Sequence, residues 1–212
     1  MSIPQGTKFH GVAPSVDTAN RGSATANARR DAYTIDQMVD YIGSRGLFTQ
    51  IADSTPVTDT TDELTIIGDG LGSLFVPANG FVRGNTFRVY MEGNLSSLNN
   101  AELTINIRDN GNVLATTGAM TLVATSGNFY QMDITFVIRQ VGAAGTAEIM
   151  TSGTFNYTKT SNNNPEVISF EQLNDTTFDT TSLSTLDITA QWGAADALNS
   201  IDTHVLTLQR VF

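Results

Sequence analysis

The chain of 212 residues contains no cysteine. This absence excludes disulfide bonds and metal sites built on thiolates. Small domains often depend on such cross-links, but a chain of this length, in which 40% of the residues are hydrophobic, can bury a core large enough to fold without them.

Charged residues are also scarce, at 15% of the chain, against about a quarter in typical globular proteins. There are 11 Lys and Arg against 21 Asp and Glu, which gives a net charge of −10. A surface that contacts nucleic-acid phosphates needs clustered basic residues. The one close basic pair here is Arg29-Arg30, so we expect no nucleic-acid partner.

A long apolar run is missing as well. No segment approaches the ~18 consecutive apolar residues of a membrane-spanning helix, so we expect no membrane partner. Met1–Gln5 lacks the basic and apolar regions that begin a secretory signal, and we expect none.

The most regular pattern in the chain is an alternation of apolar and polar side chains from Phe129 to Thr158. Successive residues of a strand point to opposite faces of a sheet. After a small-residue turn at Gly142–Gly145 the alternation resumes, which predicts a long antiparallel hairpin with one buried face. That face carries Tyr130, Met132, Ile134, Phe136, Ile138, Ala147, Ile149, Thr151, Gly153, Phe155 and Tyr157.

The rest of the chain from Asp62 onward is also organised as short strands and turns. Leu103–Arg108 and Leu186–Trp192 alternate in the same way. Asp109–Asn112 contains Asn-Gly, a pair that accepts positive φ at both central positions of a hairpin turn. We therefore predict an all-β fold, an antiparallel jelly-roll-like β-sandwich, over residues 62–212.

The N-terminal region has a different composition. Residues 1–33 contain few large apolar side chains and cannot bury enough surface to order alone. Tyr33–Gly43 has apolar residues at helical spacing, which predicts a helix of about two turns that needs a surface to dock on. We predict an arm with one short helix over residues 1–45 and a linker rich in Thr and Asp over residues 46–61.

The second face of the predicted hairpin mixes polar and apolar side chains. It carries Gln131, Asp133, Val137, Arg139, Glu148 and Met150. A fully solvated face would not need Val137 and Met150, so we expect part of it to be covered by segments flanking the second sheet or by a neighbouring subunit. These two residues are the predicted oligomer interface.

Residue types that perform catalysis do not form a recognisable pattern. The two histidines, His10 and His204, are far apart in the sequence, and the nucleophile motif Gly-x-Ser-x-Gly is absent. Asp133 and Glu148 offer the two carboxylates that glycoside hydrolysis needs, but their place on the exposed face favours solvated side chains. We predict that the protein is not an enzyme and has no catalytic residues, cofactor or metal.

Four aromatic residues allow two interpretations: Trp192, Tyr130, Tyr157 and Phe170. Exposed together, they would form a platform on which a sugar ring stacks. Trp192 is in phase with Leu186 and Ile188 along its strand, which favours packing in the core.

Two stretches resemble structural proteins of tailed phages. Residues 66–157 resemble a β-sandwich module that recurs in tailed-phage virion proteins. Its matching residues are Ile67-Gly68, Ser73–Asn79, Val82–Arg88, Leu103–Arg108 and Asp133–Gly145. The stretch from Gly6–Phe9 through Tyr33–Met38 is similar to the N-terminal segment of marine-phage and cyanophage structural proteins.

This resemblance implies a non-enzymatic structural protein of the virion. It implies a capsid decoration, a head fibre, or a neck or tail-fibre subunit, often trimeric. Residues 1–45 would anchor the subunit to capsid or tail proteins, and the sandwich would project as a trimer. The predicted anchoring residues are Phe9, Arg29, Arg30, Tyr33, Ile35, Met38 and Tyr41. The alternative is a phage-fibre module that binds a glycan or protein on the host surface.

Overall fold

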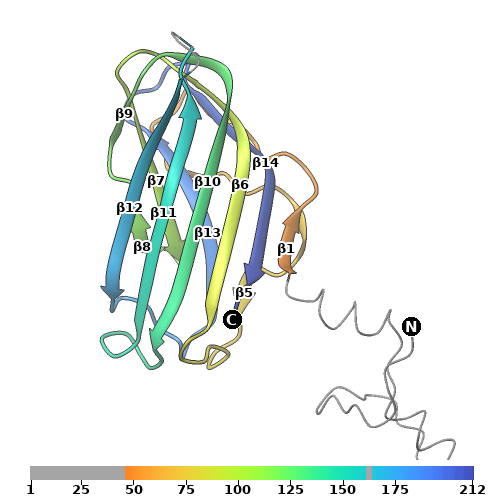
Figure 1. Ribbon diagram of the computed structural model, residues 1–212, viewed down its shortest axis with the longest axis vertical. Coiled ribbons are helices and arrows are strands. Elements are labelled where there is room, and N and C mark those ends of the chain that lie inside the picture. Colours follow the sequence, from red (N-terminus) through yellow and green to blue (C-terminus); the bar gives the residue numbers. More distant parts are fainter. Residues whose placement is uncertain (1–45, 161–163) are drawn as a thin grey trace, which may run out of the picture. The chain divides into compact units, whose positions relative to one another are not determined.

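The computed structural model describes residues 46–160 and 164–212, which form an antiparallel β-sandwich (Figure 1). The predicted all-β, jelly-roll-like sandwich is confirmed, and the described residues contain no helix. None of them therefore belongs to a helix long and apolar enough to cross a membrane.

Two sheets make the layers of the sandwich. The larger sheet has eight strands in the order β12-β11-β10-β6-β14-β1-β4, with β2 added beside β14. These strands are β1 (Gly46–Gln50), β2 (Val57–Thr58), β4 (Gly70–Gly72), β6 (Thr86–Ser97), β10 (Thr125–Gln140), β11 (Glu148–Thr158), β12 (Pro165–Asp175) and β14 (Ser200–Arg210).

The smaller sheet has six strands in the order β3-β13-β7-β8, with β5 also on β13 and β9 also on β7. These strands are β3 (Leu64–Thr65), β5 (Phe75–Val76), β7 (Ala101–Asp109), β8 (Asn112–Thr116), β9 (Met120–Leu122) and β13 (Ser184–Trp192). The chain passes repeatedly between the two sheets, so residues distant in sequence meet in one core.

The hairpin predicted from the alternation lies in the middle of the larger sheet. β10 and β11 pair from Tyr130–Tyr157 to Gln140–Glu148, and β6 continues the sheet on the other side of β10. The side chains that were predicted to face inward pack in the core between the sheets. All of the following are at most 4% exposed: Tyr130, Met132, Ile134, Phe136, Ile138, Ala147, Ile149, Thr151, Phe155 and Tyr157.

The turn between β7 and β8 has the predicted backbone. Asn110 and Gly111 both adopt positive φ, at 47° and 86°. This conformation matches the twist of a two-residue hairpin turn and costs little for Asn and Gly. The sequence alone was enough to predict this turn because the turn depends on the local backbone preferences of Asn and Gly.

The aromatic residues that allowed two interpretations belong to the core. Trp192 is 1% exposed, and its indole Nε1 donates a hydrogen bond to Val57 O at 2.9 Å. Tyr130, Tyr157 and Phe170 are buried as well. Core packing is therefore confirmed, and these rings do not form a surface on which a sugar could stack.

A close approach in the larger sheet requires glycine at position 93. Gly93 on β6 lies opposite Tyr130 on β10 and Thr203 on β14. The hydroxyl groups of Tyr130 and Thr203 are 2.6 Å apart and form a buried hydrogen bond across β6. A Cβ on residue 93 would lie 1.9 Å from Asp202 O and 2.8 Å from the Tyr130 ring. Glycine on β6 thus lets one hydrogen bond link β10 to β14 across the strand between them.

The predicted linker over residues 46–61 is wrong, because these residues are part of the sandwich. β1 pairs with both β14 and β4, and β2 pairs with β14. The Gln50 side-chain amide donates to Thr203 O at 2.7 Å, and Phe48 and Val57 are buried. The two buried apolar side chains, Phe48 and Val57, anchor this Thr- and Asp-rich segment to the larger sheet. The predicted arm and its helix lie outside the described residues.

Candidate functional site

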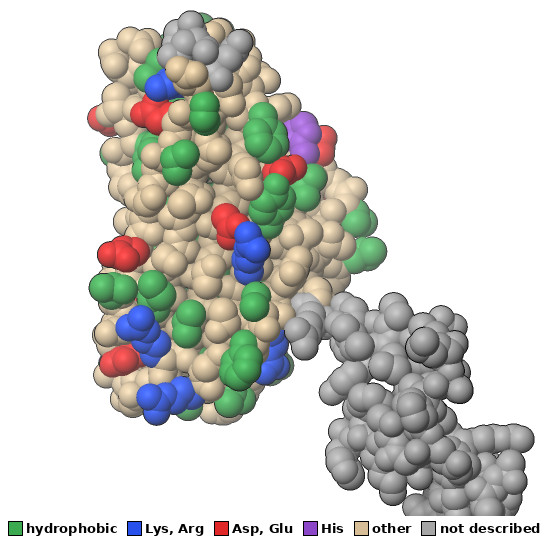
Figure 2. All heavy atoms as spheres, in the orientation of Figure 1, with side chains coloured by type: hydrophobic (Ala, Val, Ile, Leu, Met, Phe, Trp, Pro, Cys, Tyr) green, Lys and Arg blue, Asp and Glu red, His purple; other side chains and the backbone are tan. Residues whose placement is uncertain are grey.

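The outer face of the larger sheet is an exposed surface of the described chain (Figure 2). Its side chains form rows across the strands. Thr135, Ser152 and Glu171 lie opposite one another on β10, β11 and β12. Asp133 begins the next row, followed by Thr154 and Ser169. Figure 2 shows scattered hydrophobic and charged side chains among many small polar ones.

A shallow groove runs over β10, β11 and β12 on this face. Its volume is about 560 Å³. The outward side chains of its floor on β11 are short, Ser152 and Thr154, and Gly153 contributes backbone only. It is lined by Asp133, Thr135, Ser152, Gly153, Thr154, Ser169, Phe170 and Glu171. The lining is rich in hydroxyl and carboxylate groups that can bind a polar ligand.

Asp133, considered in the sequence as half of a carboxylate pair, is engaged by an arginine. Arg88 Nε donates to its two oxygens at 2.9 and 3.1 Å. Asp133 lies opposite Thr154, whereas Glu148 lies opposite Gln140, seven residues further along β10. At about 3.3 Å per residue this offset is roughly 23 Å. Glycosidase carboxylates are about 5–9.5 Å apart, so this pair does not have that geometry.

Val137 and Met150, the predicted oligomer interface, form a pair on the outer face. They lie directly opposite each other on β10 and β11, and each is half-buried by its neighbours in the sheet. Figure 2 shows no described segment lying over this face. Both side chains therefore remain partly accessible on this face among the described residues. The predicted anchoring residues, from Phe9 to Tyr41, lie outside the described residues.

One end of the sandwich gathers several loops and the C-terminus. We call it the basal end and define it by residues 75–85, 141–147, 176–184 and 211–212. Backbone hydrogen bonds join these parts: Asn79 N–H donates to Thr180 O, Thr180 N–H to Gly142 O, Gly84 N–H to Ile138 O and Thr86 N–H to Phe212 O. In Figure 1 this end lies at the bottom, beside the labels β5 and C.

The basal end exposes six large apolar side chains. Their exposed fractions range from 42% to 79%: Phe75, Val82, Val141, Leu183, Val211 and Phe212. Gly46, the first residue of β1, pairs with Gln209 near the end of β14, so residues 1–45 join the sandwich at this end. The apolar cluster and the point of chain entry were not predicted, because each depends on loops that meet only in the fold.

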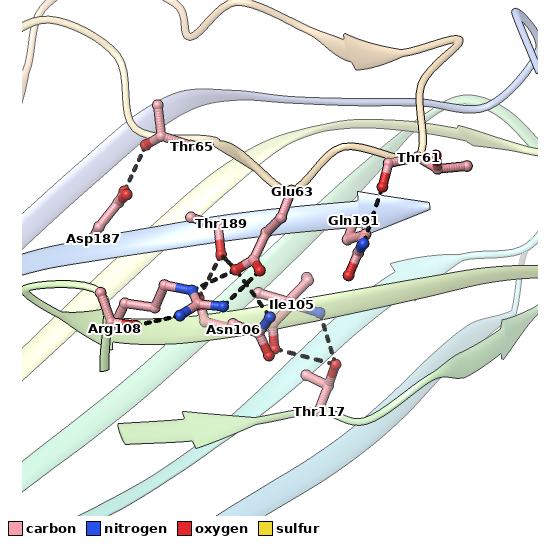
Figure 3. Close-up of polar contacts among 11 residues, drawn as sticks. Thr61, Glu63, Thr65, Ile105, Asn106, Arg108, Thr117, Asp187, Thr189 and Gln191 are labelled. Carbon is pink, nitrogen blue, oxygen red and sulfur yellow. Dashed lines mark hydrogen bonds and ion pairs between the residues drawn. The ribbon is translucent and has the colours of Figure 1, made fainter. Parts of the chain in front are cut away.

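The densest polar network lies on the outer face of the smaller sheet (Figure 3). The Glu63 carboxylate accepts hydrogen bonds from Arg108 Nε at 2.5 Å and from its terminal nitrogen at 2.6 Å. It also accepts one from Asn106 Nδ2 at 2.9 Å and one from the Thr189 hydroxyl. Nearby, the Thr65 hydroxyl donates to Asp187 at 2.6 Å. These bonds tie the segment before β3 to β7 and β13.

These bonds fix the charge of Glu63. The hydrogen bonds from Arg108, followed by those from Thr189 and Asn106, outweigh desolvation and lower its pKa from 4.5 to about 2. A carboxylate that is ionised and engaged by three side chains is poorly suited to take up or release a proton near neutral pH. The network therefore acts as a structural latch. The alternation of Asn106 and Arg108 on one strand was the signal in the sequence that could have pointed to it.

His204 also has local partners. Its Nε2 lies 2.6 Å from Asp202 Oδ2 and 3.3 Å from Asn94 Nδ2. Within residues 46–160 and 164–212, no three His, Asp or Glu side chains are placed to hold a metal ion. The exposed His204 thus belongs to a small hydrogen-bonded group on the surface.

Comparisons with known proteins find no matching family model and no matching curated protein. Among solved structures, lectin II from Ulex europaeus is 9% identical, with a TM-score of 0.40 over 78% of this chain and 93% of the lectin. The lectin UEA-II complexed with galactose is 10% identical, with a TM-score of 0.39 over 80% of this chain and 94% of that chain.

A third structure comes from a phage. The CBM2 module of the evolved Dit protein of Lactobacillus casei BL23 phage J-1 is 12% identical, with a TM-score of 0.28 over 63% of this chain and 66% of that chain. Likeness at these TM-scores identifies no function for this chain.

Replacing Glu63 tests the latch through its pH dependence. Because the pKa of Glu63 is lower in the folded state, its contribution is complete above about pH 4.5 and is lost as the pH falls toward 2. We expect Glu63→Gln to lower the free energy of unfolding at pH 7 by about 1–3 kcal/mol. The difference from the wild type should shrink between pH 4.5 and pH 2 in denaturant titrations.

The matched control is Glu171→Gln, which neutralises an exposed carboxylate on the other sheet. It should leave the stability within about 0.5 kcal/mol of the wild type at pH 7. A constant offset between Glu63→Gln and the wild type from pH 7 to pH 2 would show that the charge of Glu63 does not hold the latch.

Proposed function

We propose that this protein is a non-enzymatic structural subunit of a virion, a capsid decoration, head fibre, or neck or tail component. It docks through its basal end and residues 1–45, and the opposite end of the sandwich projects. One observation carries the proposal: residues 1–45 enter the sandwich at the end where six large apolar side chains are exposed. The resemblance of residues 66–157 to a tailed-phage virion module supports it.

The physical basis of docking through the basal end is the free-energy cost of leaving these apolar side chains in water. Contiguous exposed apolar surface on a folded protein commonly marks a contact with another protein. Full burial of one such side chain contributes about 1.5–3 kcal/mol. A segment that orders only on docking adds a wide contact at an entropic cost. Together they give a stable attachment at one end of the subunit.

Removing the arm tests the docking model. We expect a chain lacking residues 2–45 to fold, because it retains the sandwich. It should not be incorporated into particles, because it lacks the anchor. The full chain with Val82→Ser and Phe212→Ser should also be incorporated poorly, because it loses two apolar contacts at the basal end. Incorporation is measured by quantifying the subunit in purified particles.

The matched control is Leu198→Ser, which removes an apolar side chain that is 64% exposed in the loop before β14, outside the basal end. It should be incorporated like the wild type. Normal incorporation of the truncated chain would refute the anchoring role of residues 1–45. Normal incorporation of the double variant would refute the role of the basal end.

We also propose that the subunit is a trimer whose interface includes Val137 and Met150. Copies related by a threefold axis can cover this pair, over which no described segment lies. We expect the full-length protein to have a trimer's mass in light scattering after size-exclusion chromatography. Val137→Asp with Met150→Asp should shift it toward the monomer, because burying added carboxylates at an interface is costly.

The control is Val113→Asp on β8 of the smaller sheet, a residue that is 36% exposed. It should remain trimeric. A monomeric wild type, or a double variant that stays trimeric with unchanged dissociation, would contradict this interface.

The groove on the outer face supports a second candidate function, binding of a host-surface glycan. Its carboxylates and hydroxyls can hydrogen-bond sugar hydroxyl groups, and its volume suits a small saccharide. On a glycan array we expect selective binding by the wild type. Ser152→Tyr fills the groove and should abolish glycan binding. The control variant Thr116→Tyr, on the other sheet, should bind like the wild type. An array with no selective signal would eliminate this function for the groove.

A further inference from the structure

An apolar cavity lies between the two sheets, close to the basal end. Its volume is about 120 Å³. Its walls come from both sheets and from the loops that close this end. The main apolar lining residues are Leu74, Phe81, Phe87, Leu114, Phe136 and Ile149.

Aromatic rings form part of the wall. The Phe81 ring packs edge-on against Phe87 at 5.9 Å and against Phe178 at 5.2 Å. Phe87, Phe136 and Phe178 are each at most 9% exposed, so they are held by the core. These contacts fix the shape of the wall instead of letting it collapse into the space.

The polar groups at the edge of the cavity are already engaged within the protein. The Asp109 carboxylate accepts hydrogen bonds from the Ser184 hydroxyl at 2.6 Å and from Thr185 N–H at 2.8 Å. Arg108 donates to Glu63 in the latch. A molecule in the cavity would therefore meet mainly hydrocarbon and aromatic surface.

The cavity has a route to solvent beside β5. Phe75 lines the cavity and is 56% exposed, and Val76 next to it is half-buried. β5 is held on β13 by only two residue pairs, Val76 with Ser184 and Phe75 with Thr185. A two-residue strand is a small barrier to entry compared with the long ladders elsewhere in the sandwich.

We propose that this cavity is a binding site for a small apolar molecule of about the size of benzene, an aromatic ring or a short hydrocarbon chain. Cavities of roughly 150 Å³ lined by Leu, Ile and Phe stay dry and bind benzene or xenon. The lining of an empty cavity forgoes dispersion contacts that such a guest restores. The site is separate from the groove and from the Val137–Met150 pair. It shares Phe75 with the basal end, but it is argued from the cavity alone and does not rest on the proposed virion role.

Benzene titration of the full-length protein tests the site. We expect a saturable rise in the unfolding temperature, and chemical-shift changes or heats of binding that fit one site. Leu114→Phe places additional carbon atoms in the cavity and should weaken benzene binding at least tenfold while the protein still unfolds cooperatively. Leu103→Met, a core leucine outside the cavity lining, should bind like the wild type.

Size selectivity provides the second measurement. Leu114→Ala enlarges the cavity and should gain saturable binding of naphthalene, which the wild type should not bind. If Leu114→Phe does not fold, Ile149→Phe fills the same cavity from β11 and serves in its place. The proposal is overturned if benzene gives no saturable response in the wild type, or if the filled variant binds it as tightly.

Discussion

The burial of one face of β6, β10 and β11 against the smaller sheet is the constraint on which the rest of the structure depends. A strand of sixteen residues such as β10 can keep one register over its length only if its inward side chains all find apolar partners. Tyr130, opposite Gly93 and hydrogen-bonded to Thr203, fixes that register at one point across three strands. A shift by one residue would place Asp133 and Gln131 in the core.

Because the inner faces are used mainly for packing, the surfaces open to other macromolecules are the outer faces and the two ends. On the smaller sheet the outer face is occupied by the Glu63 latch, which holds the segment before β3 in place. On the larger sheet the outer face stays open and carries both the polar groove and the Val137–Met150 pair. The basal end carries six exposed apolar side chains and the start of β1. The fold thus places the exposed apolar side chains of the basal end and the polar groove on different parts of the surface.

The cavity is a consequence of the same arrangement. The long strands pack closely in the middle of the sandwich, whereas the basal end is closed by loops and by the two-residue strand β5. Loops follow their own backbone hydrogen bonds and do not fill space as regularly as interdigitating strand side chains. The aromatic contacts of Phe81 hold the wall open at that place.

The sequence by itself determined the all-β class, the hairpin of β10 and β11 and the positive-φ turn at Asn110-Gly111, because alternation and turn chemistry are local properties. It also favoured the core position of Trp192 through the phase of its strand. The tertiary structure alone decided that residues 46–61 belong to the sandwich, since β1 and β2 both pair with β14, about 150 residues away. It likewise decided the Glu63 latch, the basal cluster and the cavity, because their side chains come from loops and strands that meet only when both sheets have formed.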